Sequence, residues 1–513
     1  MVPVLLVLAL GGSTFPLATG QALAQQQQQQ QQQAPAAEQA PAAEQQAPAA
    51  DQASAAERAA ATDPATQQSR EFRAAMAAHH IASGLWVVGR STPRTAHEVV
   101  AQDIAPFVYF GWEPEFRYAV DEDRKTVTVT APGAPARTAR YTGDQGTSIL
   151  PRGQQDVFFT PVPVPRNLPA ADTVDWPMGD RMATEPFPQD VDRGAVEAAL
   201  DWAMQQTEQN TRAFVVAYRG KILGERYAPG WNKDTPQISW SQGKSITAAL
   251  IGVLIQQGHL QRQQAAPIAQ WQAADDPRRK IRIEDLLQMS SGLDFTNLGI
   301  SGPSAFTTKN EHFRVYFDSL DVFEHAVNQP PAVPPGTRCS YLNSDPLTLG
   351  KIIRDTVEAR GEDYLTFPQR ALFDRIGCRN YVLETDAWGN FILSGYDYGS
   401  ARDWIRFGLL HLQDGVWQGE RILPAGWVDF ITTPAPAEPT ENYGGLFWLN
   451  RDGRMDRVPA DAYWSAGFMG QVTLVIPSYD LVVVRMGPSP GNVYPYLNET
   501  ISRILEALPE SRR

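Results

Sequence analysis

The chain has 513 residues, of which 43 % are hydrophobic, and it carries a formal net charge of -13 at pH 7. This composition is ordinary for a globular protein, and the length allows two to four domains. An acidic chain repels phosphate backbones, so nucleic acid is not expected as a partner. No apolar run approaches the roughly 18 residues that a membrane-spanning helix needs. No Cys/His spacing is typical of zinc, so no metal or other cofactor is predicted.

Residues 1–24 have features of a signal peptide. Residues 2–10 are apolar but too few to span a bilayer, and Ala22-Leu23-Ala24 fits a small-residue cleavage site. No Lys or Arg precedes the apolar run, so the signal is atypical or the true start lies upstream. We therefore expect a periplasmic or secreted protein. The alternative to a signal peptide is a flexible hydrophobic N-terminus without a targeting role.

Residues 25–66 are of low complexity. An unbroken glutamine run covers residues 25–33, and the hexapeptide at 34–39 recurs at 40–45 and, with one change, at 47–52. Such a segment cannot bury enough apolar surface to offset the entropy lost on ordering. We expect a disordered tether here.

Residues 67–190 are predicted to form a small N-terminal α/β region, without a motif that indicates its role. Residues 71–81 have helical composition, and residues 116–120 and 126–130 alternate as the strands of a hairpin. Proline is dense from 161 to 188, which indicates a connecting strap.

Residues 191–513 are predicted to form a second domain of α+β class. Two hairpins are expected near its ends, at 214–218 with 221–227 and at 471–476 with 481–486, and helices between them at 246–257, 283–289 and 401–412. This order predicts an antiparallel sheet, closed by the two ends of the domain and flanked by helices that include a helical subdomain.

Ser241 and Lys244 are the first candidate catalytic pair. They lie three residues apart at the entrance to the apolar helix 246–257, and residues at this spacing share a helical face. Desolvation against that helix would lower the pKa of the lysine and let it accept the serine proton. The free N–H groups at the helix start would favour a developing oxyanion. A capping serine beside a surface lysine is the alternative.

Tyr341 and Asn343 follow about a hundred residues later, after a turn-rich stretch. A tyrosine near the nucleophile can pass a proton to the leaving group, helped by an adjacent cation that lowers its pKa. Asn343 could hold Lys244 or a substrate amide. A core tyrosine beside a loop asparagine is the alternative.

Ser465-Ala466-Gly467-Phe468 forms a turn just before the expected strand 471–476. We expect Ser465 and Gly467 to position the substrate, and the backbone N–H groups of Ser241 and Phe468 to form an oxyanion hole. A plain glycine turn is the alternative. Trp464, which adjoins this turn, is the best aromatic candidate for the acyl pocket.

This ordered trio resembles the β-lactamase-like, penicillin-recognising serine hydrolases, which carry S-x-x-K, Tyr-x-Asn and a Lys/His-x-Gly turn. The phrases IEDLLQMSSGL at 283–293, ARDW at 401–404 and GFMGQ at 467–471 are similar to its esterase and 6-aminohexanoate-dimer-hydrolase branch. The resemblance covers residues 195 to 510. It implies that Ser241 is acylated, that Lys244 is its base partner and that Tyr341 serves the leaving group.

One departure from the family pattern bears on the substrate. Ser465 and Ala466 stand where penicillin-binding members carry a lysine and a threonine that grip a carboxylate. Serine has no charge for this task. We therefore expect a hydrolase of small esters or linear amides, ahead of a β-lactamase or D-Ala-D-Ala carboxypeptidase. A non-catalytic envelope-binding protein is a further alternative, and the oligomeric state is open.

Two other features of the sequence bear on the site and on stability. Residues 487–491 match G-x-S-x-G, but Pro490 has no N–H for an oxyanion hole and no histidine follows His411, so a loop is predicted. Cys339 and Cys378 could form a disulfide in an exported protein, or remain as buried free thiols.

Overall fold

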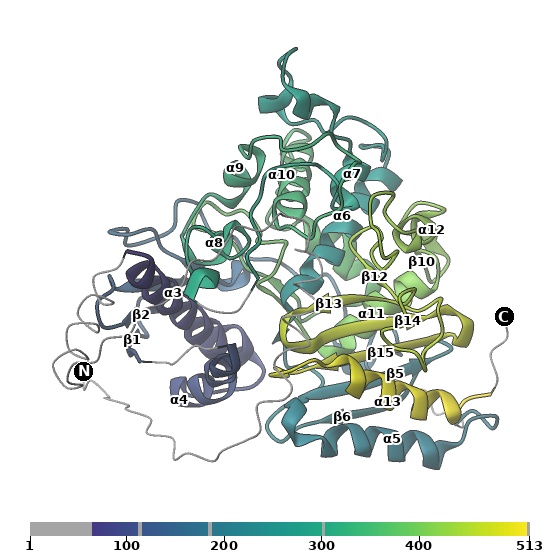
Figure 1. Cartoon of the computed structure of the whole chain (residues 1–513). Helices are drawn as coiled ribbons and strands as arrows, with labels where there is room; N and C mark the ends of the chain where they lie inside the picture. Colours follow the sequence, from purple (N-terminus) through teal and green to yellow (C-terminus); the bar gives the residue numbers. More distant parts are fainter. Residues whose placement is uncertain (1–63, 111–114, 183–186, 300–302, 510–513) are drawn as a thin grey trace, which may run out of the picture.

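The computed structural model describes residues 64–110, 115–182, 187–299 and 303–509. The expected signal peptide and nearly all of the expected tether lie outside these residues. The described chain begins with helix α3 (Pro64–Trp86), so residues 64–66 belong to a helix and not to the expected tether. Figure 1 shows two parts, the N-terminal region around α3 and the larger domain to its right.

The larger domain is built on a six-stranded antiparallel sheet with the strand order β12-β13-β14-β15-β5-β6. Its strands are β5 (Ala213–Tyr218), β6 (Lys221–Tyr227), β12 (Trp448–Leu449), β13 (Tyr463–Gly467), β14 (Gln471–Ile476) and β15 (Leu481–Met486). Both predicted hairpins are confirmed. β15 pairs with β5, so the two ends of the domain close the sheet as expected. All residues of β14, β15 and β5 are buried, which explains why these strands are mostly apolar.

Helices cover both faces of this sheet (Figure 1). The terminal helices α5 (Arg193–Gln205) and α13 (Tyr494–Glu506) pack together on one face. On the other face, α11 (Ala401–Leu412) lies against β14 and β15, and α6 (Gly243–Gln256) lies against β13. A helical subdomain continues from α6 with α7 (Ile283–Leu287), α8 (Glu311–Phe317), α9 (Val322–Val327) and α10 (Ser344–Glu358). The predicted α+β architecture is confirmed.

Smaller elements complete this domain. β7 (Gln237–Ile238), β9 (Asp397–Gly399) and β8 (Val382–Leu383) form a three-stranded sheet. β10 (Val416–Trp417) and β11 (Glu420–Arg421) form a short hairpin, followed by helix α12 (Trp427–Thr432). Helix α11 matches its predicted range, α7 ends two residues early, and α6 begins three residues earlier than expected.

The N-terminal region is a four-stranded antiparallel sheet with α3 packed across it. Its strands are β1 (Arg117–Asp121), β2 (Thr126–Thr130), β3 (Arg137–Tyr141) and β4 (Thr147–Ile149), and a short helix α4 (Ala96–Val99) follows α3. The predicted hairpin is therefore the first half of a larger sheet. α3 is longer than predicted because its buried face packs against both this sheet and the larger domain.

Buried polar contacts join the two parts through Glu384 of the larger domain. His79 Nε2 lies 2.6 Å from Glu384 Oε2, Ser83 donates to Glu384 Oε1 at 2.7 Å, and the Thr147 N–H donates to the same oxygen at 2.9 Å. The ring of His79 also stacks on Tyr396, with centroids 3.9 Å apart. The N-terminal region is therefore attached through its core.

Both cysteines are free thiols. Cys339 Sγ lies 3.6 Å from the Gln288 carbonyl and Cys378 Sγ lies 3.5 Å from the Asp403 carbonyl. The free-thiol alternative is confirmed, with Cys378 buried and Cys339 only partly buried, and the disulfide alternative is wrong. In the described ranges, no helix is long and apolar enough to cross a membrane, and no three His, Cys, Asp or Glu side chains gather in a metal-binding arrangement.

Candidate active site

Ser241 lies in a short 3-10 turn, η7 (Trp240–Gln242), which leads directly into α6. Trp240 has a φ of 51°, a left-handed conformation that costs about 1–3 kcal/mol in a residue with a bulky side chain. Its ring is 4 % exposed and is held by Tyr396 at 5.3 Å and Phe468 at 5.6 Å between centroids. Packing therefore maintains a strained turn at the candidate nucleophile.

Lys244 faces Ser241 from the first turn of α6. Its Nζ lies 2.9 Å from Ser241 Oγ and 2.9 Å from the Ser394 carbonyl oxygen, and 4.9 Å from the centroid of the Tyr341 ring. The side chain is buried. Burial lowers the pKa of Lys244 to about 7, against the opposing charge of Asp397. Near neutral pH, a large share of Lys244 is a neutral amine with a lone pair.

Asp397 is a part of this site that the sequence analysis missed. It lies at the start of β9 and is 1 % exposed. A Cβ atom on Gly243 would lie 2.3 Å from Asp397 Oδ1, so a glycine must precede Lys244. Burial raises the pKa of Asp397 to about 7, while a hydrogen bond from Ser239 opposes the shift. No motif or spacing links this residue to Lys244.

Tyr341 lies beside the pair, with its ring 5.5 Å from Trp448 and 5.7 Å from Tyr443 between centroids. Burial raises the pKa of its hydroxyl well above the usual value, and a hydrogen bond with Ser241 opposes this shift. The expectation that a neighbouring cation lowers this pKa is wrong, because burial has the larger effect. Tyr341 is therefore a protonated donor at neutral pH.

Asn343 is fully buried at the N-cap of α10. Its Nδ2 donates to the His312 carbonyl at 2.6 Å, so it fixes the backbone of α8 beside Tyr341. The expectation that Asn343 holds Lys244 or a substrate amide stays a prediction.

The end of β13 lies against the Ser241 turn. A Cβ atom on Gly467 would lie 1.9 Å from the Ser239 carbonyl oxygen, so only glycine permits this approach. Phe468, the next residue, begins the 3-10 turn η13 (Phe468–Gly470). The strand end and the turn that carry the two predicted oxyanion donors therefore lie side by side.

Ser465 is 1 % exposed, and its hydroxyl donates to Gln242 Oε1 at 2.8 Å. It therefore supports the residue after Ser241, and its expected role in substrate positioning stays a prediction. Trp464 is wrong as a pocket candidate. Because successive side chains of β13 point to opposite faces of the sheet, Trp464 lies on the face away from Ser465, in the core with α5 and α13.

Ser489 of the G-x-S-x-G match is buried in the loop after β15. Its hydroxyl donates to Gln209 Oε1 at 2.7 Å and its N–H donates to the Met469 carbonyl at 2.8 Å. The prediction of a loop at this motif is confirmed.

The N-terminal region also contacts the turn that carries Ser241 and the Phe468 side chain, which no sequence signal indicated. The His80 ring lies 5.5 Å from Trp240, and the Phe107 ring lies 6.1 Å from Trp240 and 5.9 Å from Phe468. The region therefore packs against the residue before Ser241 and against Phe468 itself.

Comparison with known proteins agrees with this fold. A profile of the Beta-lactamase family matches residues 196–498, which is more than half of the chain. The chain therefore belongs to the Beta-lactamase family, a family of hydrolases, and the resemblance drawn from its motifs is confirmed.

Individual relatives are distant. A 6-aminohexanoate-dimer hydrolase from Paenarthrobacter ureafaciens is 22 % identical over 309 residues, covering 56 % of this chain and 76 % of the relative. Among solved structures, a provisionally assigned 6-aminohexanoate-dimer hydrolase from Bacillus anthracis superposes with a TM-score of 0.50 at 21 % identity, over 68 % of this chain and 89 % of that one. A provisionally assigned β-lactamase from Bacteroides dorei superposes with a TM-score of 0.49 at 19 % identity, over 62 % of this chain and 99 % of that one.

Proposed function

We propose that this protein is a serine hydrolase that cleaves small esters or linear amides through an acyl-enzyme on Ser241. The observation that carries the proposal is the buried Lys244, with its Nζ 2.9 Å from Ser241 Oγ and its pKa lowered to about 7. A neutral amine at this distance can take the serine proton as Oγ attacks the substrate carbonyl.

The remaining steps use groups already in place. The carbonyl π electrons move to the oxygen, which the N–H groups of Ser241 and Phe468 would stabilise. Collapse of this intermediate breaks the bond to the leaving group, which takes the proton of Tyr341. In deacylation, water gives a proton to Tyr341 and adds to the acyl carbon. The bond to Oγ then breaks, and Ser241 recovers its proton from Lys244.

The choice of esters and linear amides rests on Ser465. This residue offers no positive charge to a β-lactam carboxylate, and its hydroxyl is already bonded to Gln242. The similarity to a protein named 6-aminohexanoate-dimer hydrolase is consistent with linear amide chemistry. Export to the periplasm or medium is a further part of the proposal and depends on the sequence of residues 1–24.

The test is turnover of three chromogenic substrates, a p-nitrophenyl ester, a linear p-nitroanilide and a cephalosporin, by the wild type and Ser241→Ala. We expect ester or anilide turnover that Ser241→Ala loses while it keeps its circular dichroism spectrum. Preferential cephalosporin turnover would favour the β-lactamase alternative. Folded wild-type protein that turns over none of the three would favour the binding-protein alternative.

A further inference from the structure

Two residues in left-handed backbone conformations flank the proposed oxyanion hole. Trp240, which precedes Ser241, has a φ of 51°. Met469, which follows Phe468, has a φ of 59°. This conformation is unfavourable for any residue except glycine, and it persists only where the surrounding structure holds it. The positions of both proposed N–H donors therefore depend on the packing around their strained neighbours.

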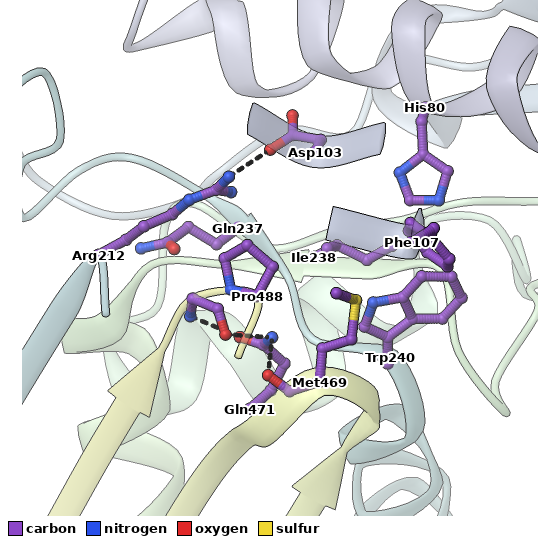
Figure 2. Close-up of a pocket in the computed structure, with 11 residues that line it drawn as sticks. His80, Asp103, Phe107, Arg212, Gln237, Ile238, Trp240, Met469, Gln471 and Pro488 are labelled. Carbon is purple, nitrogen blue, oxygen red and sulfur yellow. Dashed lines mark hydrogen bonds and ion pairs between the residues drawn. The ribbon is translucent and has the colours of Figure 1, made fainter. Parts of the chain in front are cut away.

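Phe107 of the N-terminal region packs against both of these turns. It lies in η3 (Ala105–Phe110) and is 3 % exposed. Its ring centroid lies 6.1 Å from that of Trp240 and 5.9 Å from that of Phe468, and the latter two are 5.6 Å apart. Figure 2 shows Phe107 beside the Trp240 ring, on a wall that Met469 also lines. Aromatic pairs are favourable at centroid distances of about 4.5–7 Å, so the three rings hold one another.

His80 adds a second contact from the N-terminal region. Its ring lies 5.6 Å from Phe107 and 5.5 Å from Trp240 between centroids. Burial lowers the pKa of His80 to about 3, with the charge of His79 contributing. The ring is therefore neutral near pH 7 and packs as an uncharged aromatic group.

Ion pairs fix the segment that carries Phe107 on the larger domain. Arg212 Nη2 lies 2.6 Å from Asp103 Oδ1 and donates to the Gln102 carbonyl at 2.7 Å. Arg94 Nη1 lies 2.5 Å from Asp103 Oδ2. None of these three charged side chains is more than 13 % exposed, and partly buried pairs are screened less than surface pairs. The place of the Phe107 ring is thus set by contacts with the larger domain itself.

We propose that Phe107 is a positioning residue for the oxyanion hole, through which the N-terminal region takes part in catalysis by the larger domain. The inference rests on the proposed function, because it requires an oxyanion bound by the N–H groups of Ser241 and Phe468. The Beta-lactamase profile matches residues 196–498, so the contact comes from outside the family domain. Without the ring, Trp240 and Phe468 lose a shared partner, the strained turns can relax, and the two donors no longer converge.

Phe107→Ala should lower kcat/KM for p-nitrophenyl acetate and the affinity for phenylboronic acid in parallel, by about tenfold or more each. The boronate is a transition-state analogue, because its boron becomes tetrahedral on Ser241 Oγ and places an oxygen among the oxyanion donors. Both values are expressed per active site, counted by titration with a fluorophosphonate. A role in folding alone would reduce the number of active sites and leave both per-site values unchanged, and this result would overturn the proposal.

Phe72→Ala is the matched control. Phe72 is a fully buried phenylalanine of the N-terminal region, and its ring centroid lies 6.2 Å from that of Phe317 in the larger domain. The variant should lose stability to urea as Phe107→Ala does, but keep both per-site values. Phe107→Leu keeps an apolar side chain and should show a smaller parallel loss; it replaces Phe107→Ala if that variant does not fold. Equal per-site losses in Phe72→Ala would show a general effect of destabilisation and overturn the proposal.

Hydrogen exchange measured by mass spectrometry separates this inference from the proposed function, because it requires no turnover. Phe107→Ala should exchange faster than the wild type and Phe72→Ala in η7 (Trp240–Gln242) and η13 (Phe468–Gly470). Faster exchange there, in a protein whose wild type hydrolyses no ester, would support the positioning of the two turns by Phe107 and contradict the proposed function. Ester turnover with unchanged per-site values and unchanged exchange in Phe107→Ala would contradict the inference alone.

Discussion

The protonation state of Lys244 depends on two opposing effects. Burial lowers its pKa to about 7, and the charge of Asp397 raises it. Acylation needs the neutral amine, so kcat/KM should rise with pH through this pKa. The ordinary lysine pKa of 10.5 would leave almost no base at pH 7.

Asp397→Asn should move the acidic limb of the pH–kcat/KM profile to lower pH. The substitution removes the negative charge that favours the ammonium form, so the pKa of Lys244 falls, by about half a unit or more. The measurement is ester hydrolysis from pH 5 to 9. A limb that stays in place or moves to higher pH would show that Asp397 does not act on Lys244.

Tyr341→Phe should separate amides from activated esters. An amine leaving group needs a proton, whereas p-nitrophenolate leaves without one. The variant should therefore lose about 10²–10⁴-fold in the rate of acylation by a linear anilide, measured as single-turnover release of p-nitroaniline, and far less in the rate of acylation by the p-nitrophenyl ester. Equal losses on both substrates would indicate that Tyr341 supports the site through packing alone.

At the level of secondary structure, the junction between β13 and η7 determines the geometry of the proposed oxyanion hole. Ser239 and Gly467 approach so closely that any Cβ at 467 would lie 1.9 Å from the Ser239 carbonyl oxygen. The Ser465 hydroxyl and Gln242 add a hydrogen bond across the same junction. The spacing of the two N–H donors therefore depends on this contact.

Gly467→Ala should push β13 away from the turn and lower kcat by about 10²-fold, as the loss of one oxyanion donor does. Overpacking should also cost about 1–3 kcal/mol of stability, measured by urea unfolding. Gly194→Ala near the start of α5 is the control, since its Cβ would meet no atom closer than 3.4 Å. Wild-type kcat in Gly467→Ala would contradict the proposed oxyanion hole.

At the scale of the whole molecule, the N-terminal region and the larger domain are joined at Glu384. Its carboxylate receives contacts from His79, Ser83 and the Thr147 N–H. Removing the carboxylate leaves these buried groups without their acceptor, which typically costs about 3–5 kcal/mol for a buried charged partner. The two parts should therefore lose stability together.

Glu384→Ala should reduce hydrogen-exchange protection in α3 and in β8–β9 at the same time, as measured by mass spectrometry. Glu420→Ala is the control, because Glu420 is exposed and its ion pair with Arg375 lies on the surface. In this variant, the hydrogen-exchange protection of α3 and of β8–β9 should not change. Lost protection confined to one of the two parts would show that they are stable independently.

The features that short sequence patterns determine were predicted correctly. Apolar alternation and turn residues located both hairpins of the main sheet, and the spacing of Ser241 and Lys244 placed them on one face. Roles that depend on long-range packing were missed or misplaced. Asp397 lies about 150 residues from Lys244, Ser465 turns toward Gln242, and His80 comes from a different part of the chain. No local pattern encodes these contacts.

The most direct test of Ser241 as the nucleophile is intact-mass spectrometry after exposure to a fluorophosphonate probe, with peptide mapping of the adduct. We expect a single phosphonyl adduct on Ser241 of the wild type and none on folded Ser241→Ala. Absence of any adduct on folded wild-type protein, or an adduct that persists in Ser241→Ala, would contradict this assignment.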